Sequence, residues 1–323
     1  MKRFKVVAIL VLALGIGLPA GRASGQIDYG PIDQLPSVKG QSSFTFLTIG
    51  LSPRAAAMGE AFSAMMADVN AIFYNPAALG FIEKGQYSIS YINWLAGSNL
   101  FSGAAVHRAF GGVWGFSMVS ARPEAVEETT IFESLGTGRM IRGGNLAVGV
   151  AFARQMTDKV SWGLQAKYIR EDLVLATTST WQFDLGITAH TGYRSFRIAA
   201  AARNVGGETT AETRPFSPPI YFNFGVAGEI VGNEGDPAYL TVATETLFAT
   251  DYGQRWHFGG ELWLNNAIAL RAGYKSNYEI ENYGLGVGVK QGIGDGEIRI
   301  DVSYNEGGED FSAPLRMAIG GSF

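Results

Sequence analysis

Alternation of apolar and polar residues is the clearest pattern in this chain, and it is most regular near the C-terminal end. In residues 296–305, the apolar side chains Ile298, Ile300, Val302 and Tyr304 fall on one face, and polar residues occupy most positions between them. The last nine residues repeat the arrangement. A period of two predicts β-strands with one apolar and one polar face.

The same pattern recurs along most of the chain in segments of about ten residues. These segments are separated by residues typical of turns. Strands that cross a membrane at a tilt need ~9–11 residues, so the lengths fit that environment. We predict about fourteen strands, at residues 85–95, 99–108, 111–121, 143–155, 159–170, 178–190, 193–204, 219–231, 238–248, 254–264, 266–275, 282–290, 295–305 and 312–323.

Two architectures share this pattern: a soluble β-sandwich, whose apolar faces pack together, and an outer-membrane barrel, whose apolar faces meet lipid. The connections favour the barrel. Short turns are predicted at Phe110-Gly111, Thr157-Asp158, Thr191-Gly192, Asn265-Asn266 and 292–294, and long loops at 123–142 and 206–218. Turns at one end and loops at the other are typical of an outer-membrane barrel. We therefore predict an all-β fold, an antiparallel transmembrane barrel of about fourteen strands.

The polar faces of these strands would line the lumen. Mixed charges there indicate either ion-pair networks that hold a plug or side chains that only contact water in the lumen, and both interpretations stay open. The side chains predicted to point inward are Arg154, Gln165, Lys167, Asp184, Glu229, His257, Glu261, Arg271, Lys275, Glu297, Arg299, Asp301 and Arg316. Glycines 284, 286 and 288 alternate on one strand, which indicates close packing inside the barrel and not a nucleotide site.

The first residues are typical of a secretory signal peptide. Lys2, Arg3 and Lys5 precede an apolar run at residues 6–18, and small residues end at Gly25. We predict that residues 1–25 are removed on export. This loss of four basic residues would change the formal charge from −4 to about −8.

Composition narrows the class of protein further. The chain has no cysteine, which excludes a disulfide, a thiolate metal site and a lipid anchor at the cleavage point. Glycine is abundant, with 43 residues, and charged residues make up only 17%. The acidic balance argues against nucleic acid as a partner.

Residues 26–84 do not show the strand pattern throughout. An alanine- and methionine-rich stretch follows Leu51, and Asn75-Pro76-Ala77 then resembles a helix start, with asparagine as the N-cap and proline at the first helical position. Gly80 is expected just past the end of this short helix. We predict that residues 26–84 include a hatch or plug and that residues 85–323 form the barrel.

One run of this region resembles a known family. Residues 50–62, followed by Ala67-Asp68 and residues 74–79, resemble the N-terminal pattern of PorV/PorQ-type outer-membrane proteins, within the wider FadL-like superfamily of fatty acid transporters. The resemblance implies a fourteen-stranded barrel with an N-terminal hatch. It is specific over about residues 44–80 and concerns only the architecture beyond them.

This resemblance implies two functions. PorV-like members are accessory barrels of type IX secretion, with secreted proteins or a translocon as partners. FadL-like members pass hydrophobic small molecules through a gated barrel. The first is our main expectation and the second the alternative. Side chains that could line an apolar pocket at the hatch are Phe62, Met65, Met66, Phe73 and Tyr74, and the alternative is ordinary packing of the plug against the barrel wall.

The remaining expectations concern location and chemistry. We expect the protein in the outer membrane of a Gram-negative-type bacterium, in contact with its lipid and with both termini in the periplasm. Resemblance to outer-membrane proteins in general implies that the barrel-assembly machinery reads Phe323. His107, His190 and His257 lie on separate predicted strands, and no nucleophile motif or phosphate loop occurs, so we expect no enzyme activity, metal or cofactor.

Overall fold

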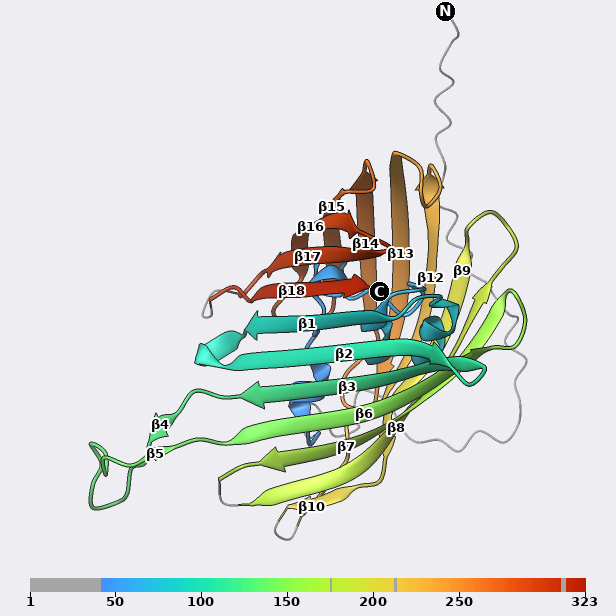
Figure 1. Cartoon of the computed structure of the whole chain (residues 1–323). Coiled ribbons are helices and arrows are strands. Elements are labelled where there is room, and N and C mark those ends of the chain that lie inside the picture. Colours follow the sequence, from blue (N-terminus) through green and yellow to red (C-terminus); the bar gives the residue numbers. More distant parts are fainter. Residues whose placement is uncertain (1–41, 175, 212–213, 309–311) are drawn as a thin grey trace, which may run out of the picture. The chain divides into compact units, whose positions relative to one another are not determined.

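The computed structural model describes residues 42–174, 176–211, 214–308 and 312–323. Fourteen antiparallel strands form a closed barrel in the order β1-β18-β17-β16-β15-β14-β13-β12-β9-β8-β7-β6-β3-β2. Most neighbours in the barrel are neighbours in the sequence, and β1 pairs with β18 to close it. In Figure 1, β1 to β8 run across the view, whereas β12, β13 and β14 stand nearly upright behind them. The predicted fold class is thereby confirmed.

The barrel strands are 8 to 14 residues long. Their bounds are β1 Gln86–Asn93, β2 Asn99–Ala109, β3 Gly112–Arg122, β6 Gly144–Gln155, β7 Val160–Asp172, β8 Thr177–His190, β9 Arg197–Gly206, β12 Tyr221–Val231, β13 Ala238–Ala249, β14 Arg255–Leu264, β15 Ile268–Ser276, β16 Tyr283–Ile293, β17 Gly296–Asn305 and β18 Leu315–Ser322. Two short hairpins lie outside the barrel sheet, β4 Val126–Glu127 with β5 Met140–Ile141 and β10 Thr209–Ala211 with β11 Arg214–Phe216.

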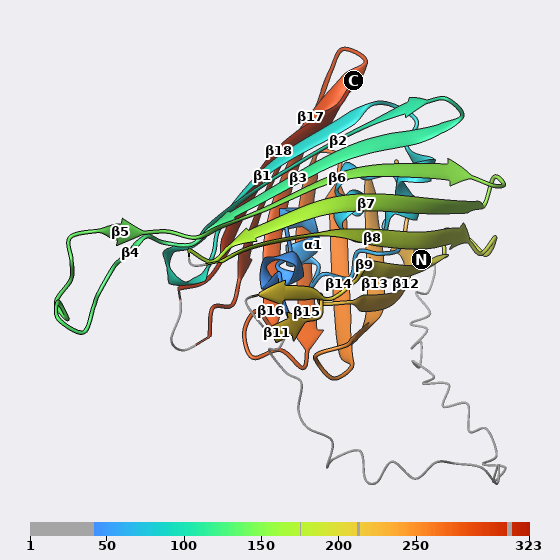
Figure 2. The same ribbon diagram turned by 90° about the horizontal axis from the view of Figure 1, so that it is seen from below.

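The connections are sorted as the sequence predicted. One end, here called the short-turn end, carries tight turns in which Phe110, Gly111, Asn265 and Asn266 all have positive φ. Glycine and asparagine tolerate that conformation, which suits the twist of a two-residue hairpin. The opposite, long-loop end carries the β4–β5 hairpin, which reaches beyond the barrel strands in Figure 2. The strand predicted at 193–204 begins only at Arg197, because residues 191–196 form a turn in which Thr191 N–H bonds to Phe196 C=O.

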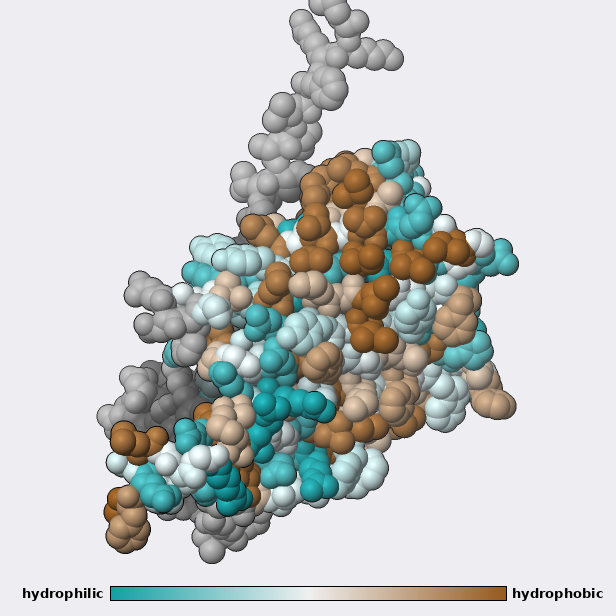
Figure 3. All heavy atoms as spheres, turned by 60° about the vertical axis from the view of Figure 1, so that its left-hand side comes forward, coloured by the Kyte–Doolittle hydropathy of each residue, from teal (hydrophilic) through white to brown (hydrophobic). Residues whose placement is uncertain are grey.

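Inward and outward faces follow the period-two pattern. Ile300 and Tyr304 are exposed on β17, whereas Asp301 and Ser303 between them are buried. The face in Figure 3 shows apolar side chains gathered in its upper half and hydrophilic ones below them and at the edges. The predicted inward direction is wrong for one residue: Arg154 of β6 is exposed with the outward Phe152, and Ala151 and Ala153 face inward instead.

Residues 42–84, here called the hatch segment, form short helices that pack against inward-facing strand residues, with α1 in contact with β15 to β18 and η4 in contact with β6, β7 and β8. The helices are η2 Thr45–Thr48, α1 Pro53–Ala57, η3 Val69–Phe73 and η4 Pro76–Phe81, and η5 Leu95–Gly97 follows β1. None of the helices among the described residues is long and apolar enough to cross a membrane. The predicted signal peptide, residues 1–25, and residues 26–41 lie outside the described residues.

Glycines on the inner wall let the hatch segment approach the strands. A Cβ atom on Gly273 of β15 would lie 2.0 Å from the Gly59 nitrogen, and one on Gly284 of β16 would lie 2.3 Å from the Ala56 oxygen. A Cβ on Gly286 would lie 2.5 Å from the Ala57 side chain. The predicted packing role of the β16 glycines therefore has a physical cause, since only glycine leaves room for the α1 backbone.

Candidate functional site

Asn75 connects the hatch segment to the barrel wall. Its side-chain oxygen accepts a hydrogen bond from Ala77 N–H at 3.0 Å, which caps helix η4. Its amide nitrogen donates to the Ser63 carbonyl at 2.9 Å and to Thr188 Oγ1 of β8 at 2.8 Å. The asparagine is fully buried, so each polar atom has a partner inside the protein.

Pro76 and Ala77 complete the predicted motif by lying against the wall. A Cβ on Gly163 of β7 would meet the Pro76 carbonyl carbon at 2.4 Å and the Ala77 nitrogen at 2.5 Å. The expectation for Gly80 is wrong: η4 continues through it to Phe81. Gly80 instead lies close to Ser161 of β7, where a Cβ would have no room. The physical constraint at this glycine is therefore close packing and not a helix end.

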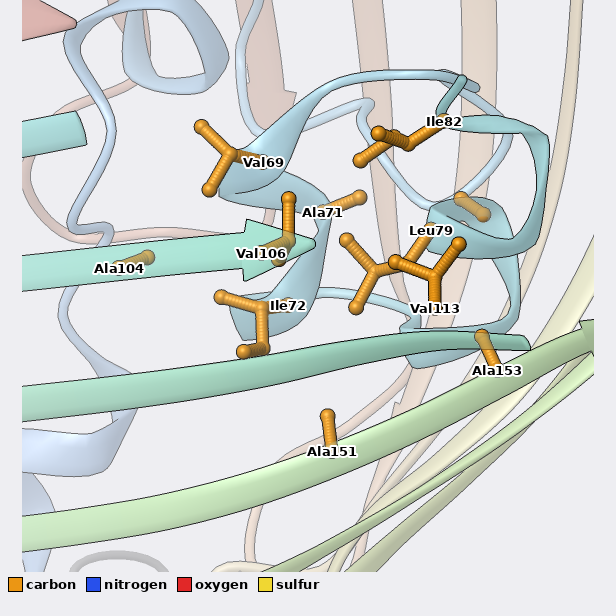
Figure 4. Close-up of a cluster of buried hydrophobic side chains, with 11 residues drawn as sticks. Val69, Ala71, Ile72, Leu79, Ile82, Ala104, Val106, Val113, Ala151 and Ala153 are labelled. Carbon is orange, nitrogen blue, oxygen red and sulfur yellow. The ribbon is translucent and has the colours of Figure 1, made fainter. Parts of the chain in front are cut away.

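An apolar cluster holds this side of the hatch segment to the wall. Val69, Ala71, Ile72, Ala78, Leu79 and Ile82 come from the hatch segment, and Ala104, Val106, Val113, Ala151 and Ala153 from strands β2, β3 and β6. Figure 4 shows these side chains directed at one another across the gap between η3, η4 and the strands. Alanines on the wall and larger residues on the hatch fill the space together.

A ring of six ion-paired side chains holds the opposite side. Adjacent members are joined by N···O distances of 2.5 to 2.9 Å, and positive and negative groups alternate. The members, in order around the ring, are Arg54, Asp68, Arg299, Asp301, Arg271 and Glu261. Two of them belong to the hatch segment and four to β14, β15 and β17, so this ionic ring links the hatch segment to three strands.

The pKa of the Asp68 carboxyl shows how strongly the neighbouring arginines of the ring stabilise its charge. Burial alone would raise the pKa of the Asp68 carboxyl, but the Arg299 and Arg54 guanidinium groups outweigh it and hold that pKa well below its usual range. The carboxylate also accepts a hydrogen bond from Asn70 N–H at 2.8 Å, which caps η3. Asp68 therefore stays ionised inside the barrel.

Further buried pairs neutralise most of the remaining predicted lumen charges. Lys167 pairs with Asp184 at 2.8 Å and Arg197 with Glu229 at 3.0 Å. A third group joins Glu281 to Arg316 at 2.6 Å and to Lys275 at 3.2 Å. Of the two interpretations of the mixed charges, the network that holds a plug is thus the one that the contacts favour.

The predicted pocket residues occupy three positions. Phe62, Met65 and Tyr74 share one buried cluster, in which the Phe62 and Tyr74 ring centroids are 5.2 Å apart. Phe73 lies between three clusters and is only partly buried. Met66 lies with Met65 at a vestibule near the short-turn end. The structure therefore brings together three of the five residues and leaves Phe73 beside two small cavities and Met66 at the vestibule.

Cavities lie on both sides of the Phe62–Tyr74 pair, here called the aromatic barrier. Toward the long-loop end are two small cavities of about 40 and 30 Å³, both lined by Leu51, Phe73 and Arg203. Toward the short-turn end lies the vestibule of about 320 Å³, lined by Arg54, Met65 and other residues. Tyr74 lines the larger of the two small cavities and Met65 lines the vestibule, so the cluster that contains Phe62 lies between them.

Two arginines flank the aromatic barrier. The Arg54 guanidinium lies 5.6 Å from the Phe62 ring centroid, and the Arg203 guanidinium lies 5.5 Å from that of Tyr74. Both contacts are within the range of cation–π attraction. Glu245 of β13 fixes the backbone here by accepting hydrogen bonds from Phe62 N–H at 3.1 Å and from Ser63 N–H at 2.8 Å. Glu245 therefore fixes the backbone at Phe62 and Ser63, and each ring of the barrier has an arginine beside it.

Sequence reasoning missed Arg54, Asp68, Arg203 and Glu245 as parts of this site. Arg54 and Asp68 do fall within the run that resembles PorV/PorQ-type proteins, and that was the available signal. Arg203 and Glu245 occupy inward positions of β9 and β13, but nothing local distinguishes them from other lumen residues. Their partners lie 129 and 183 residues away in the sequence.

Comparisons with known proteins concern the fold. No protein-family model and no curated protein matches the sequence. The toluene transporter TodX of Pseudomonas putida is a similar structure, with 14% identity and a TM-score of 0.58 over 84% of this chain and 98% of TodX. The monoaromatic hydrocarbon channel CymD has 11% identity and a TM-score of 0.55, over 85% of this chain and 98% of CymD.

A FadL homologue of Pseudomonas aeruginosa has 12% identity and a TM-score of 0.52, over 85% of this chain and 98% of that one. These similarities show that the chain has the fold of FadL-type outer-membrane barrels. They do not confirm the PorV/PorQ part of the resemblance.

Proposed function

We propose that this protein is a non-enzymatic outer-membrane channel for hydrophobic small molecules, closed at its hatch segment. The observation that carries the proposal is the aromatic barrier between the vestibule and the small cavities of the long-loop end. Phe62 and Tyr74 offer apolar ring surface in the cluster that lies between the small cavity lined by Tyr74 and the vestibule lined by Met65. The FadL-type fold supports this reading, since TodX is a toluene transporter and CymD a hydrocarbon channel.

We expect the barrier to be the moving part, because ionic contacts hold the rest of the hatch segment in place. The ionic ring and the buried ion pairs anchor the hatch segment to the wall, and breaking a buried pair costs ~3–5 kcal/mol. Rotation of two aromatic side chains requires no such loss. Passage would therefore proceed by local displacement of Phe62 and Tyr74 while the hatch segment stays docked.

Uptake into proteoliposomes would test this proposal. Replacing Phe62 with Ala should speed entry of toluene or a medium-chain alkane, because the barrier loses one ring. Phe110→Ala is the matched control, since Phe110 is 95% exposed in a turn. Folding of each variant is checked by its mobility on an unheated SDS gel. Equal, background-level uptake by all three proteins would exclude the channel.

Ligand analysis gives an independent readout. Mass spectrometry of the protein purified in mild detergent should find an apolar molecule in stoichiometric amount, and Phe62→Ala or Met65→Ala should release it. A barrel that carries no such molecule would argue against the proposal.

An accessory role in protein secretion is the second candidate, and one exposed surface favours it. The β4–β5 hairpin carries Ile131, Phe132 and Leu135 at its tip, and these side chains are 96 to 98% exposed. Exposed apolar patches of this kind mark sites of protein or membrane contact. A pull-down that recovers a translocon or secreted polypeptides, and that loses them when Phe132 is replaced by Ser, would favour this candidate over the channel.

A further inference from the structure

A groove of about 560 Å³ lies on the outer wall of β3, β6 and β7, at their long-loop ends. Its basic lining residues are Arg122, Arg142 and Arg170. All three are exposed, and they occupy positions of the same parity as the outward residues Phe116, Val150 and Tyr168. The groove therefore belongs to the outer surface of the barrel and is separate from the lumen.

Strand register brings the three arginines together. Leu146 of β6 lies opposite both Ser120 of β3 and Arg170 of β7. Arg122 is two positions beyond Ser120, and Arg142 is two positions before Gly144, which pairs with Asp172. Gly144 has open space where a side chain would stand, so nothing fills the groove between the arginines.

The arginines have no ion-pair partner among the described residues, whose salt bridges involve other side chains. Asp172 is the single acidic residue in the lining, and its Oδ1 accepts a hydrogen bond from Val174 N–H at 3.1 Å. Three positive charges face one negative charge in a chain whose formal net charge is −4. The groove is thus a local excess of positive charge that an anion would complement.

The wall next to the groove is apolar and aromatic. Met118 and Leu146 line its lower part. Tyr168, the outward residue before Arg170 on β7, packs against Trp181 of β8 with ring centroids 5.4 Å apart. Tyrosine and tryptophan gather where hydrocarbon meets the polar head groups of a membrane, and arginine side chains reach just beyond that level. The surface therefore changes from apolar to aromatic to cationic toward the long-loop end.

We propose that this groove binds a phosphate-bearing lipid of the surrounding membrane. Guanidinium groups bind phosphate oxygens through paired N–H donors, and three of them meet here without competing carboxylates in ion-pair contact. Met118 and Leu146 would contact the acyl chain below. A lipid is favoured over free phosphate because the apolar floor of the groove continues into the lipid-facing wall. The site is independent of what the lumen transports.

Native mass spectrometry of the full-length barrel in mild detergent tests the proposal with a matched pair of lipids. Phosphatidic acid and diacylglycerol with the same acyl chains differ only in the phosphate. We expect phosphatidic acid to be retained about tenfold or more over diacylglycerol, a ratio that corresponds to ~1.4 kcal/mol. Replacing Arg122, Arg142 and Arg170 together with Gln should abolish that preference.

Arg154→Gln is the control, because Arg154 is also exposed on the outer face of β6 but lies near its short-turn end. It should leave the preference unchanged. A triple Arg→Lys variant should retain part of it, which separates loss of charge from loss of fold. Equal retention of the two lipids, an unchanged preference in the triple Gln variant, or displacement of phosphatidic acid by equimolar inorganic phosphate would each overturn the proposal.

Discussion

At the scale of single residues, buried polar side chains join parts of the chain that are far apart in sequence. Asn75 of the hatch segment donates hydrogen bonds to Thr188 on the wall and to Ser63 within the hatch. Glu245 on the wall accepts hydrogen bonds from Phe62 and Ser63 of the hatch segment. A buried group of this kind costs free energy when its partners are removed, because no water replaces them. Such residues therefore set where the hatch segment docks.

Replacing Asn75 with Ala should destabilise the protein by about 2–4 kcal/mol, since an N-cap and two further hydrogen bonds are lost. The midpoint of urea unfolding, followed by tryptophan fluorescence, measures the loss. Amide hydrogen exchange should speed up over residues 76–82. Asn93→Ala is the control, because Asn93 is exposed on β1. An unchanged midpoint in Asn75→Ala would show that the hatch segment docks without this residue.

At the scale of elements, the hatch segment and the wall fit because glycine alternates with larger residues on the inner faces. Two adjacent positions of β14 show the contrast. A Cβ on the inward Gly259 would lie 2.4 Å from the Met58 carbonyl oxygen, whereas the nearest atom to a Cβ on the outward Gly260 is 4.0 Å away. The inner face is therefore packed to contact, and the outer face has room.

Gly259→Ala should cost about 1–3 kcal/mol, because the new methyl group overlaps backbone that α1 and the ionic ring hold in place. Gly260→Ala should leave stability nearly unchanged. Urea unfolding of both variants measures the difference, and uptake of a small apolar solute shows whether Gly259→Ala also displaces the hatch segment. Equal effects at the two positions would contradict the close packing described here.

At the scale of the whole molecule, opposite sides of the hatch segment are held by different forces. An apolar cluster joins it to β2, β3 and β6, and the ionic ring joins it to β14, β15 and β17. The ionic ring makes this docking depend on pH through Asp68. Because the folded-state pKa of Asp68 is lowered, its contribution is complete above the unfolded pKa of ~3.9 and is lost as pH falls below that value.

The contribution of Asp68 to the free energy of unfolding of the wild-type protein should therefore stay constant between pH 7 and pH 5 and should decline below about pH 4. Asp68→Asn should cost about 3–5 kcal/mol at pH 7, because Arg54 and Arg299 lose a shared partner. The difference between variant and wild type should shrink in acid. Asp158→Asn, in an exposed turn, is the control. Parallel pH curves for Asp68→Asn and wild type would contradict the assignment.

Sequence alone determined the features that depend on neighbours along the chain. Strand number, approximate strand bounds, the sorting of turns and loops, and most inward positions follow from period-two alternation and turn chemistry, which are local. Arg154 shows the limit. Ala151 and Ala153 alternate with the large residues Phe152 and Arg154, and a shift of one position exchanges the two faces. Phe323 as an assembly signal, the domain bounds and the orientation of the termini stay predictions.

Tertiary structure decided which inward side chains meet. The ionic ring joins residues between 54 and 301, and the aromatic barrier is completed by Arg203 and Glu245 from strands that no local pattern links to the hatch segment. Barrel closure and strand shear set those distances, so they are absent from any short stretch of sequence. The outer groove has the same origin: three arginines separated by 20 and 28 residues meet because β3, β6 and β7 are neighbours in the closed sheet.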